Sequence, residues 1–196
     1  MIPTAFLQSW SRKAPWPDLR QVEQDLIICR ALCDLFNAPA LKHKIAFRGG
    51  TAINKLLFKQ PLRYSEDIDL VQTQAEPIGT TVDAIRDALS WLGKCKREQA
   101  GHSMHLVFKF TPEADAQATL KLKIEINTRE HESLFPIRPY PFAVDSDWYQ
   151  GGCWNQQHGH PVPYRKEDQV DAVSGLAQKL HAKYPAVLVE MHDPIG

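Results

Sequence analysis

Apolar residues recur every three or four positions in several segments of the chain, which is the spacing of an amphipathic helix. Helices are therefore predicted over residues 19–36, 51–59, 79–92 and 167–184. Proline or glycine follows each of the first three segments and marks where the helix ends. Residues 3–18 contain three prolines and two tryptophans, so an irregular arm or a short helix is expected there.

Apolar and polar residues alternate in other segments, which is the period of a strand with one buried face. Strands are predicted over residues 44–48, 65–72, 104–110 and 119–127. A long ordered loop is expected over residues 131–163, which are rich in proline, glycine, histidine and aromatic residues. Helices and strands alternate early and strands cluster later, which favours an α/β (α+β) fold with a mixed sheet flanked by helices.

The composition is that of an ordinary soluble protein, with 196 residues, 43% hydrophobic and 23% charged. The net charge is zero, so any contact with nucleic acid must come from local basic patches. The four cysteines lack zinc-type pairs and are interpreted as buried, reduced thiols. No apolar run approaches the length of a membrane span and no signal peptide is visible, so the protein is expected to be cytoplasmic, with no membrane partner.

Candidate chemistry is concentrated in residues 47–70, where Asp67 and Asp69 lie two positions apart on a predicted strand. Both carboxylates then point to the same face, and such oxygen ligands suit a divalent cation such as Mg²⁺ or Mn²⁺. A chance pair at a solvated strand end is the alternative. The apolar neighbours Ile68 and Leu70 favour a buried strand, on which uncompensated carboxylates would be costly. Glu125 is the natural third ligand, although a surface glutamate in a polar row explains it too.

A second feature is the sequence Gly49-Gly50-Thr51, between a predicted strand and a predicted helix. Backbone N–H groups at such a helix start bind phosphate, although an ordinary tight turn is the simpler explanation. Ser65 beside the Asp pair has no evident histidine base and fits a loop-capping hydroxyl. Lys179 either reaches the site or extends along the surface.

The run 47–70 resembles the nucleotidyltransferase toxins of the AbiEii/AbiGii family, which includes the MenT-type toxins. The family pattern is G-G-[ST]-x-x-x-K followed by R-x-S-x-D-x-D, and this chain has GGTAINK at 49–55 and RYSEDID at 63–69. The family's acidic residue on a later strand resembles Glu125 in KIEIN, and its late lysine resembles Lys179 in AQKLHA.

The resemblance implies a DNA polymerase β-like core over about residues 20–185, which uses an NTP and Mg²⁺ to transfer a nucleoside monophosphate. In this family the acceptor can be tRNA, and a cognate antitoxin usually accompanies the toxin. The implied metal ligands are Asp67, Asp69 and Glu125. The implied nucleotide-binding residues are Gly49, Gly50, Thr51, Lys55, Arg63 and Ser65, and Lys179 is expected to contact the triphosphate during catalysis.

The chain departs from the family pattern after the Lys179 segment, where members continue into an R-D-x-x-D element and a helical domain. A single nucleotidyltransferase domain over residues 1–196 is expected, with the helical part reduced or missing from about residue 167. Two hypotheses follow. The first is a metal-dependent nucleotidyltransferase toxin. The alternative is a catalytically impaired, truncated member that binds nucleotide or a partner protein without turnover.

Overall fold

A computed structural model of the chain describes residues 2–58, 60–131, 137 and 139–154. All of these belong to one compact unit, residues 1–158. The predicted helix over 167–184 lies outside the described residues, and the single-domain boundary of 1–196 stays a prediction. No described helix is long and apolar enough to cross a membrane.

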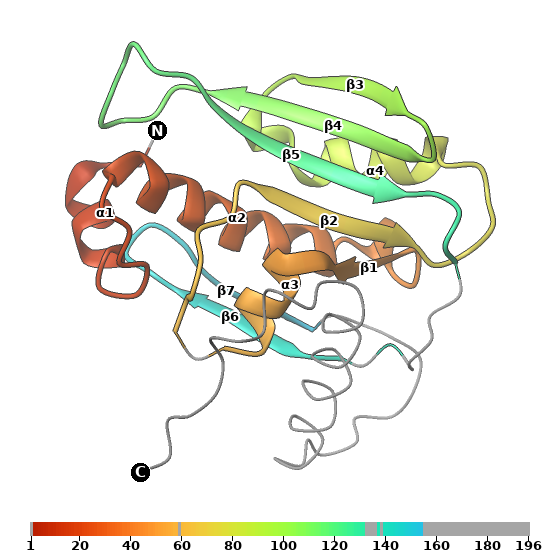
Figure 1. Cartoon of the computed structure of the whole chain (residues 1–196), viewed down its shortest axis with the longest axis horizontal. Coiled ribbons are helices and arrows are strands. Elements are labelled where there is room, and N and C mark those ends of the chain that lie inside the picture. The colour runs from red at the N-terminus through yellow and green to blue at the C-terminus, as the bar shows by residue number, and fades with distance from the viewer. Residues whose placement is uncertain (1, 59, 132–136, 138, 155–196) are drawn as a thin grey trace, which may run out of the picture. The chain divides into compact units, whose positions relative to one another are not determined.

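The main sheet has five strands in the order β1-β2-β5-β4-β3. Only the central pair, β2 with β5, is parallel; the other neighbours are antiparallel. The strands are β1 (Ile45–Arg48), β2 (Asp67–Gln72), β3 (Cys95–Ala100), β4 (Ser103–Phe110) and β5 (Leu120–Asn127). The helices are α1 (Thr4–Trp10), α2 (Leu19–Asn37), α3 (Gly49–Leu56) and α4 (Gly79–Ala88), with 3₁₀ turns at Pro39–Leu41 and Ser90–Leu92. The predicted mixed α/β sheet flanked by helices is confirmed (Figure 1).

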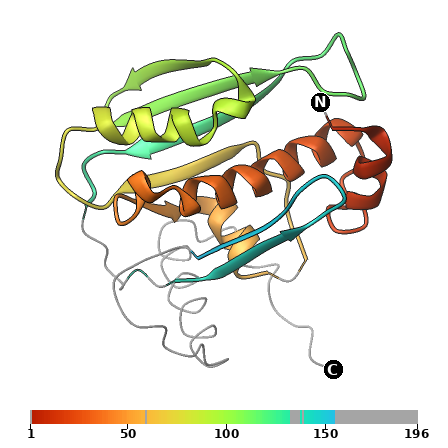
Figure 2. The ribbon, with the colours of Figure 1, turned by 180° about the vertical axis from the view of Figure 1, so that it is seen from behind.

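The two faces of the sheet differ in chemistry because the strands alternate buried and half-exposed residues. The buried face carries Ile68, Leu106 and Ile124, each 0% exposed. Helices α2 and α4 lie across this face, as Figure 2 shows from behind. The opposite face carries the polar positions of β2, β4 and β5 and faces the viewer in Figure 1.

Helix α2 is the central element of the core. Asp18 caps it by accepting a hydrogen bond from the backbone N–H of Arg20 (2.9 Å). From Val22 to Cys33 only Arg30 is not buried. The reason is that α2 has neighbours on several sides: α1, α4, β5 and the two-stranded sheet of β6 (Pro141–Asp145) and β7 (Gln150–Trp154).

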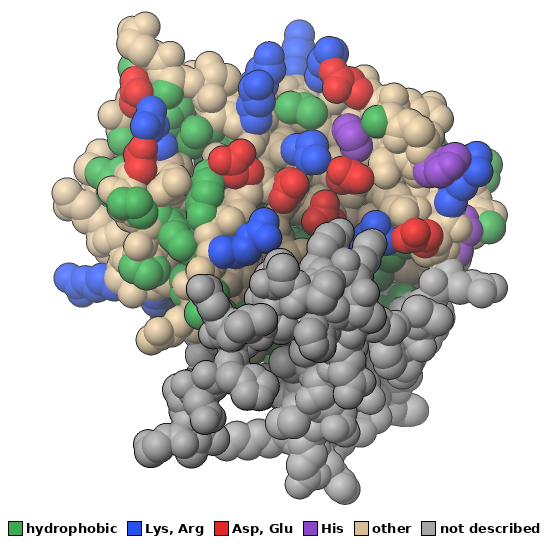
Figure 3. Space-filling view, viewed as in Figure 1, with side chains coloured by type: hydrophobic (Ala, Val, Ile, Leu, Met, Phe, Trp, Pro, Cys, Tyr) green, Lys and Arg blue, Asp and Glu red, His purple; other side chains and the backbone are tan. Residues whose placement is uncertain are grey.

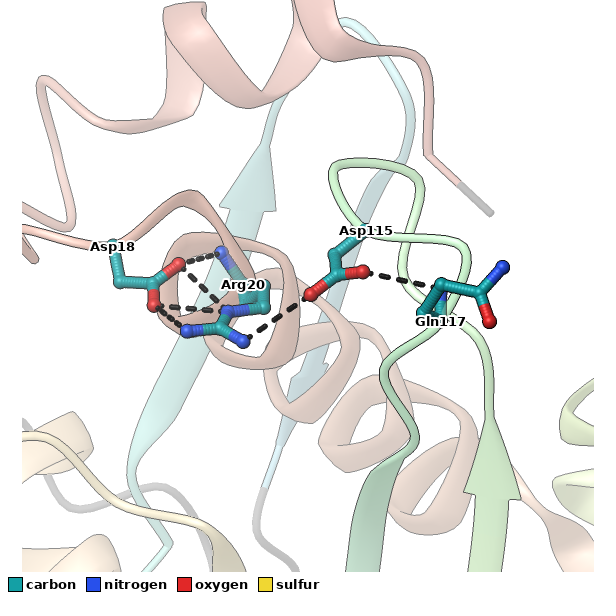
Figure 4. Close-up of polar contacts among 4 residues, drawn as sticks. All are labelled: Asp18, Arg20, Asp115 and Gln117. Atoms are coloured by element: carbon teal, nitrogen blue, oxygen red, sulfur yellow. Dashed lines mark hydrogen bonds and ion pairs between the residues drawn. The ribbon is translucent and has the colours of Figure 1, made fainter.

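Figure 4 shows how the start of α2 is tied to the loop between β4 and β5. The guanidinium of Arg20 pairs with Asp18 (2.5 Å) and lies 3.4 Å from a carboxylate oxygen of Asp115. The other oxygen of Asp115 accepts a hydrogen bond from the backbone N–H of Gln117 (3.1 Å). Arg20 holds the pKa of Asp18 below its usual value, chiefly through their side-chain hydrogen bond.

Polar residues of α2 reach into the core and position strands. The side-chain amide of Gln24 donates to the backbone oxygens of Glu66 (3.2 Å) and Lys121 (2.9 Å), at the starts of β2 and β5. Glu23, which is fully buried, accepts a hydrogen bond from the backbone N–H of Glu113 (2.9 Å). Helix α2 therefore holds the two parallel strands at their N-terminal ends.

Asp25 is the third polar residue and collects several donors, among them the thiol of Cys29 (3.8 Å). It accepts hydrogen bonds from the indole N–H groups of Trp10 (3.0 Å) and Trp16 (3.3 Å) and from Lys55 of α3 (2.5 Å). Lys55 also lies 3.3 Å from the sulfur of Cys29. The side chains of Asp25 and Lys55 are 5% and 9% exposed, so this is a buried ion pair.

Some predicted boundaries are wrong. Residues 131–163 were expected to form a loop, but they contain β6 and β7. These strands begin with Pro141 or contain the pair Gly151-Gly152, which are poor strand formers, so no alternation revealed them. The edge strand β3 was missed because its residues are almost all exposed and polar. Helix α3 begins at Gly49 rather than at Thr51.

The ion pair between Asp25 and Lys55 generates a stability prediction. Replacing Lys55 by methionine is expected to lower the free energy of unfolding by about 3 kcal/mol, because Asp25 keeps its buried charge without the cation. Urea denaturation of the purified protein measures the change. The exposed Lys42 offers a control, and Lys42→Met is expected to change stability by less than about 0.5 kcal/mol. Equal stability of the two variants would contradict the structural role of Lys55.

Candidate active site

The carboxylates predicted to act together lie on the polar face of the sheet. Asp67 and Asp69 alternate along β2 with the buried Ile68 and Leu70, as predicted. In the parallel register Asp69 lies directly beside Glu125 of β5. The structure therefore brings the three predicted acidic residues onto one surface, where Figure 3 shows acidic and basic side chains gathered.

The register also places Asp69 and Glu125 in a row that crosses all five strands. In strand order from β3 to β1 its members are Glu98, His105, Glu125, Asp69 and Arg48. The ring nitrogen Nε2 of His105 lies 3.3 Å from Glu125 Oε2. Asp69 therefore has a carboxylate on one side and an arginine on the other.

A lysine that the sequence did not single out lies among these carboxylates. Lys123 is the neighbour of Asp67 in the register and precedes Glu125 by two residues on the same face. Its ammonium nitrogen lies 3.2 Å from Glu125 Oε2 and 3.7 Å from Asp67 Oδ2. The alternation of β5 predicts from the sequence that Lys123 and Glu125 share a face of the strand. Only the pairing of β5 with β2 shows that Asp67 lies next to Lys123.

The electrostatics of the site show that the carboxylates repel one another. Burial raises the pKa of Asp69 above its usual value, and the charges of Asp67 and Glu125 raise it further. Burial alone would raise the pKa of Glu125 too, but hydrogen bonds from Lys123 and Ser103 leave it below its usual value. The negative charge of the site is therefore only partly compensated by its own cations.

Gly49, the first residue of α3, lies against Asp69. Its φ is +78°, a conformation that glycine adopts readily. A Cβ atom at this position would collide with Asp69 Oδ2 and lie 3.0 Å from the Cβ and Cγ of Asp69. The first turn of α3 and the acidic strand therefore approach so closely that a side chain at position 49 would require Asp69 to move.

The other residues of the two sequence motifs surround this first turn. A Cβ added to Gly50 would lie 3.3 Å from a guanidinium nitrogen of Arg63, so Arg63 borders the start of α3. Thr51 is 2% exposed. The hydroxyl of Ser65 is buried and has no hydrogen-bond partner among the described residues.

Asn54 of α3 is a positioning residue that the sequence reasoning missed. Its side-chain amide donates to the backbone oxygen of Arg63 (2.9 Å), and its oxygen accepts from the N–H of Leu62 (2.9 Å). Asn54 thus fixes the segment before β2 against α3. Its place between Gly49 and Lys55 in the first motif was the available signal.

Two predicted site residues stand apart from this arrangement. Lys55 was expected to bind nucleotide, but its ammonium is buried and paired with Asp25, so the geometry gives it a structural partner. Its role at a nucleotide stays a prediction. Lys179 lies outside the described residues, and its predicted contact with a triphosphate stays a prediction as well.

The carboxylates of the site are the kind of ligand that a divalent metal ion binds. Three carboxylates on two adjacent strands are the ligand type that Mg²⁺ and Mn²⁺ prefer. As the side chains lie, no group of three or more histidine, cysteine, aspartate or glutamate residues within the described part of the chain is arranged to hold a metal ion. The residue types fit a divalent cation, while the ammonium of Lys123 lies between two of the carboxylates.

A mixed sheet whose acidic face meets a glycine-started helix agrees with the nucleotidyltransferase core that the sequence resemblance implies. The family described as "Nucleotidyl transferase AbiEii toxin, Type IV TA system" matches residues 30–164, which is more than half of the chain. The protein belongs to this family. Comparison with curated proteins gave no match.

Solved structures that match this chain include JHP933 from Helicobacter pylori, at 13% identity and a TM-score of 0.44. The match covers 78% of this chain and 55% of JHP933. Another is MenT4, a nucleotidyltransferase toxin from Mycobacterium tuberculosis, at 13% identity and a TM-score of 0.42. That match covers 66% of this chain and 44% of MenT4. This chain thus spans about half the length of these two proteins.

The close approach of Gly49 to Asp69 generates a second prediction. Gly49→Ala is expected to destabilise the protein by at least about 1 kcal/mol more than Gly101→Ala, because both glycines have positive φ but only Gly49 has an atom in the way. Urea denaturation measures both. Adding Asp69→Ala to Gly49→Ala should recover most of the excess. Equal effects of the two glycine substitutions would show that the close approach carries no cost.

Proposed function

We propose that this protein is a divalent-metal-dependent nucleotidyltransferase that transfers a nucleoside monophosphate from an NTP to an RNA acceptor and acts as a toxin. The observation that carries the proposal is the position of Asp67, Asp69 and Glu125 on one sheet face, against the start of α3. Burial raises the pKa of Asp69, the charges of Asp67 and Glu125 raise it further, and a divalent cation at these oxygens would relieve that repulsion. Membership of the AbiEii family supports the same reaction.

The residues of the proposed site have two roles: the carboxylates would bind a metal ion, and the start of α3 would bind phosphates. Asp67, Asp69 and Glu125 would hold Mg²⁺ or Mn²⁺, which when bound neutralises phosphate charge and favours ionisation of the acceptor hydroxyl. Gly49 and Gly50 leave the backbone N–H groups at the start of α3 open to the phosphates. In the transfer, the acceptor oxygen bonds to the α-phosphorus, the bond to pyrophosphate breaks, and the hydroxyl proton leaves to solvent.

Arg63 and three further residues complete the proposed nucleotide site. The guanidinium of Arg63 beside Gly50 adds a positive charge and planar donors for a phosphate. Thr51 and Ser65 would add hydroxyl groups from the same region, and Ser65 has an unused buried hydroxyl there. Lys179 would contact the triphosphate from outside the described residues.

Lysines on the same sheet face support a nucleic-acid acceptor, for which tRNA is our proposal. Lys109 and Lys121 are direct cross-strand neighbours, and both are exposed. Like charges directly opposite one another destabilise a sheet, and a row of phosphates would remove that cost. Both lysines share the face of Lys123 and Glu125, where the acceptor hydroxyl must arrive.

Membership of the family supports a proposal about the cellular setting. We propose that a cognate antitoxin restrains the protein and that both act in the cytoplasm, where NTP and tRNA are available. The nucleotidyltransferase domain is proposed to span residues 1–196, and the family match covers residues 30–164 of it. Binding of nucleotide or partner protein without turnover is the alternative.

A transfer assay tests the proposed reaction. Purified protein incubated with total tRNA, Mg²⁺ and each α-³²P-labelled NTP in turn is expected to label tRNA with at least one nucleotide. The double variant Asp67→Ala, Asp69→Ala should label none, because two of the three proposed metal ligands are gone. If no NTP labels tRNA but the protein still binds nucleotide, the alternative is favoured, in which the protein binds nucleotide without turnover.

The acceptor surface is tested by salt dependence. The double variant Lys109→Gln, Lys121→Gln is expected to bind tRNA more weakly and to lower the slope of log affinity against log salt by about 1 to 2, because two phosphate contacts are lost. Lys42→Gln, Arg86→Gln removes the same charge from exposed positions elsewhere and should leave the slope unchanged. Fluorescence anisotropy at several salt concentrations measures both. Equal slopes would place the acceptor on another surface.

A further inference from the structure

Lys123 has an unusual position for a lysine on a catalytic face. Its ammonium lies 3.2 Å from Glu125 and 3.7 Å from Asp67, two of the three carboxylates proposed to hold metal. The side chain is 37% exposed, so one end of it reaches solvent. Strand alternation keeps Lys123 and Glu125 on one face, and the β2–β5 register keeps Asp67 next to them.

The ammonium is charged in this position. A lysine side chain is protonated at neutral pH, and Glu125 and Asp67 lie beside it as counter-charges. A fixed positive charge beside these oxygens repels a divalent cation that approaches the same oxygens.

The arrangement of the carboxylates agrees with a site organised around the lysine. Among the described residues, no three acidic, histidine or cysteine side chains are gathered as metal ligands would be. Asp67 and Glu125 instead both lie near the ammonium of Lys123. The lysine stem has four flexible carbons, so the head group can leave without any movement of β5.

We propose that Lys123 is an internal counter-cation that occupies the carboxylates in the metal-free protein and competes with the divalent ion for them. The inference rests on the proposed function, since it assigns the carboxylates to metal. Lys123 is a positioning residue in this scheme. It keeps the affinity for a free ion low until the phosphates of an NTP offer its ammonium another anionic partner.

Binding of Mn²⁺ alone tests the proposal without any turnover. Titration followed by electron paramagnetic resonance gives the free and bound ion in the full-length protein. Lys123→Met is expected to bind Mn²⁺ roughly threefold to tenfold more tightly than the wild type, because two competing, partly exposed ion pairs are removed. Lys123→Arg keeps the charge and should retain the weak affinity of the wild type.

Lys121→Met is the matched control, since Lys121 lies on the same strand and face two residues earlier. Within the described residues it forms no ion pair with the three carboxylates, and its substitution should change the Mn²⁺ affinity by less than about twofold. If Lys123→Met binds Mn²⁺ as tightly as the wild type or more weakly, the inference about Lys123 is overturned, while the proposed metal site stands. Absence of Mn²⁺ binding by both proteins would overturn the metal assignment in the proposed function as well.

Thermal unfolding adds a second readout. Without metal, Lys123→Met is expected to melt at a lower temperature than the wild type, because the carboxylates lose a counter-charge. With Mn²⁺ added, the gain in melting temperature should be larger in the variant than in the wild type. A gain equal to or smaller than that of the wild type would contradict competition.

Discussion

The parallel pairing of β2 with β5 is the constraint on which the candidate site depends. These strands are separated by α4, β3 and β4 in the sequence, yet their register places Asp69 beside Glu125 and Asp67 beside Lys123. A shift of β2 by one residue would turn Asp67 and Asp69 into the core and separate them from Glu125. Gln24 of α2 holds the starts of both strands through their backbone oxygens, so the core helix and the acidic face are parts of one arrangement.

The acidic face is held in place by interactions on its other sides. Asp69 lies against Gly49 in the first turn of α3, and burial together with the charges of Asp67 and Glu125 raises its pKa. Asn54 ties α3 to the segment before β2, and Lys55 anchors the same helix to Asp25 in the core. A rigid, unfavourable cluster of charge is what a binding site for a divalent cation and phosphates needs, and the surrounding packing supplies the rigidity.

The sequence predicted the elements whose patterns have a physical period. β2 and β5 were predicted because one buried face forces strict alternation, and α2 was predicted because its apolar residues follow the helical repeat. β3 has almost no buried residue, and β6 and β7 contain proline and a glycine pair, so none of the three carries such a period. Their strand conformation comes from pairing with neighbouring strands, and the sequence of one segment alone does not reveal that pairing.

The sequence also predicted only part of the candidate site. By itself the sequence determined that Asp67 and Asp69 share one face of their strand and that Lys123 and Glu125 share one face of theirs. It also determined that a glycine pair starts a helix. These facts depend only on local geometry. Only the tertiary structure decided which faces meet. Strand register put Lys123 between two carboxylates, and helix packing turned Lys55 towards Asp25, because contacts between distant segments depend on how the whole core packs.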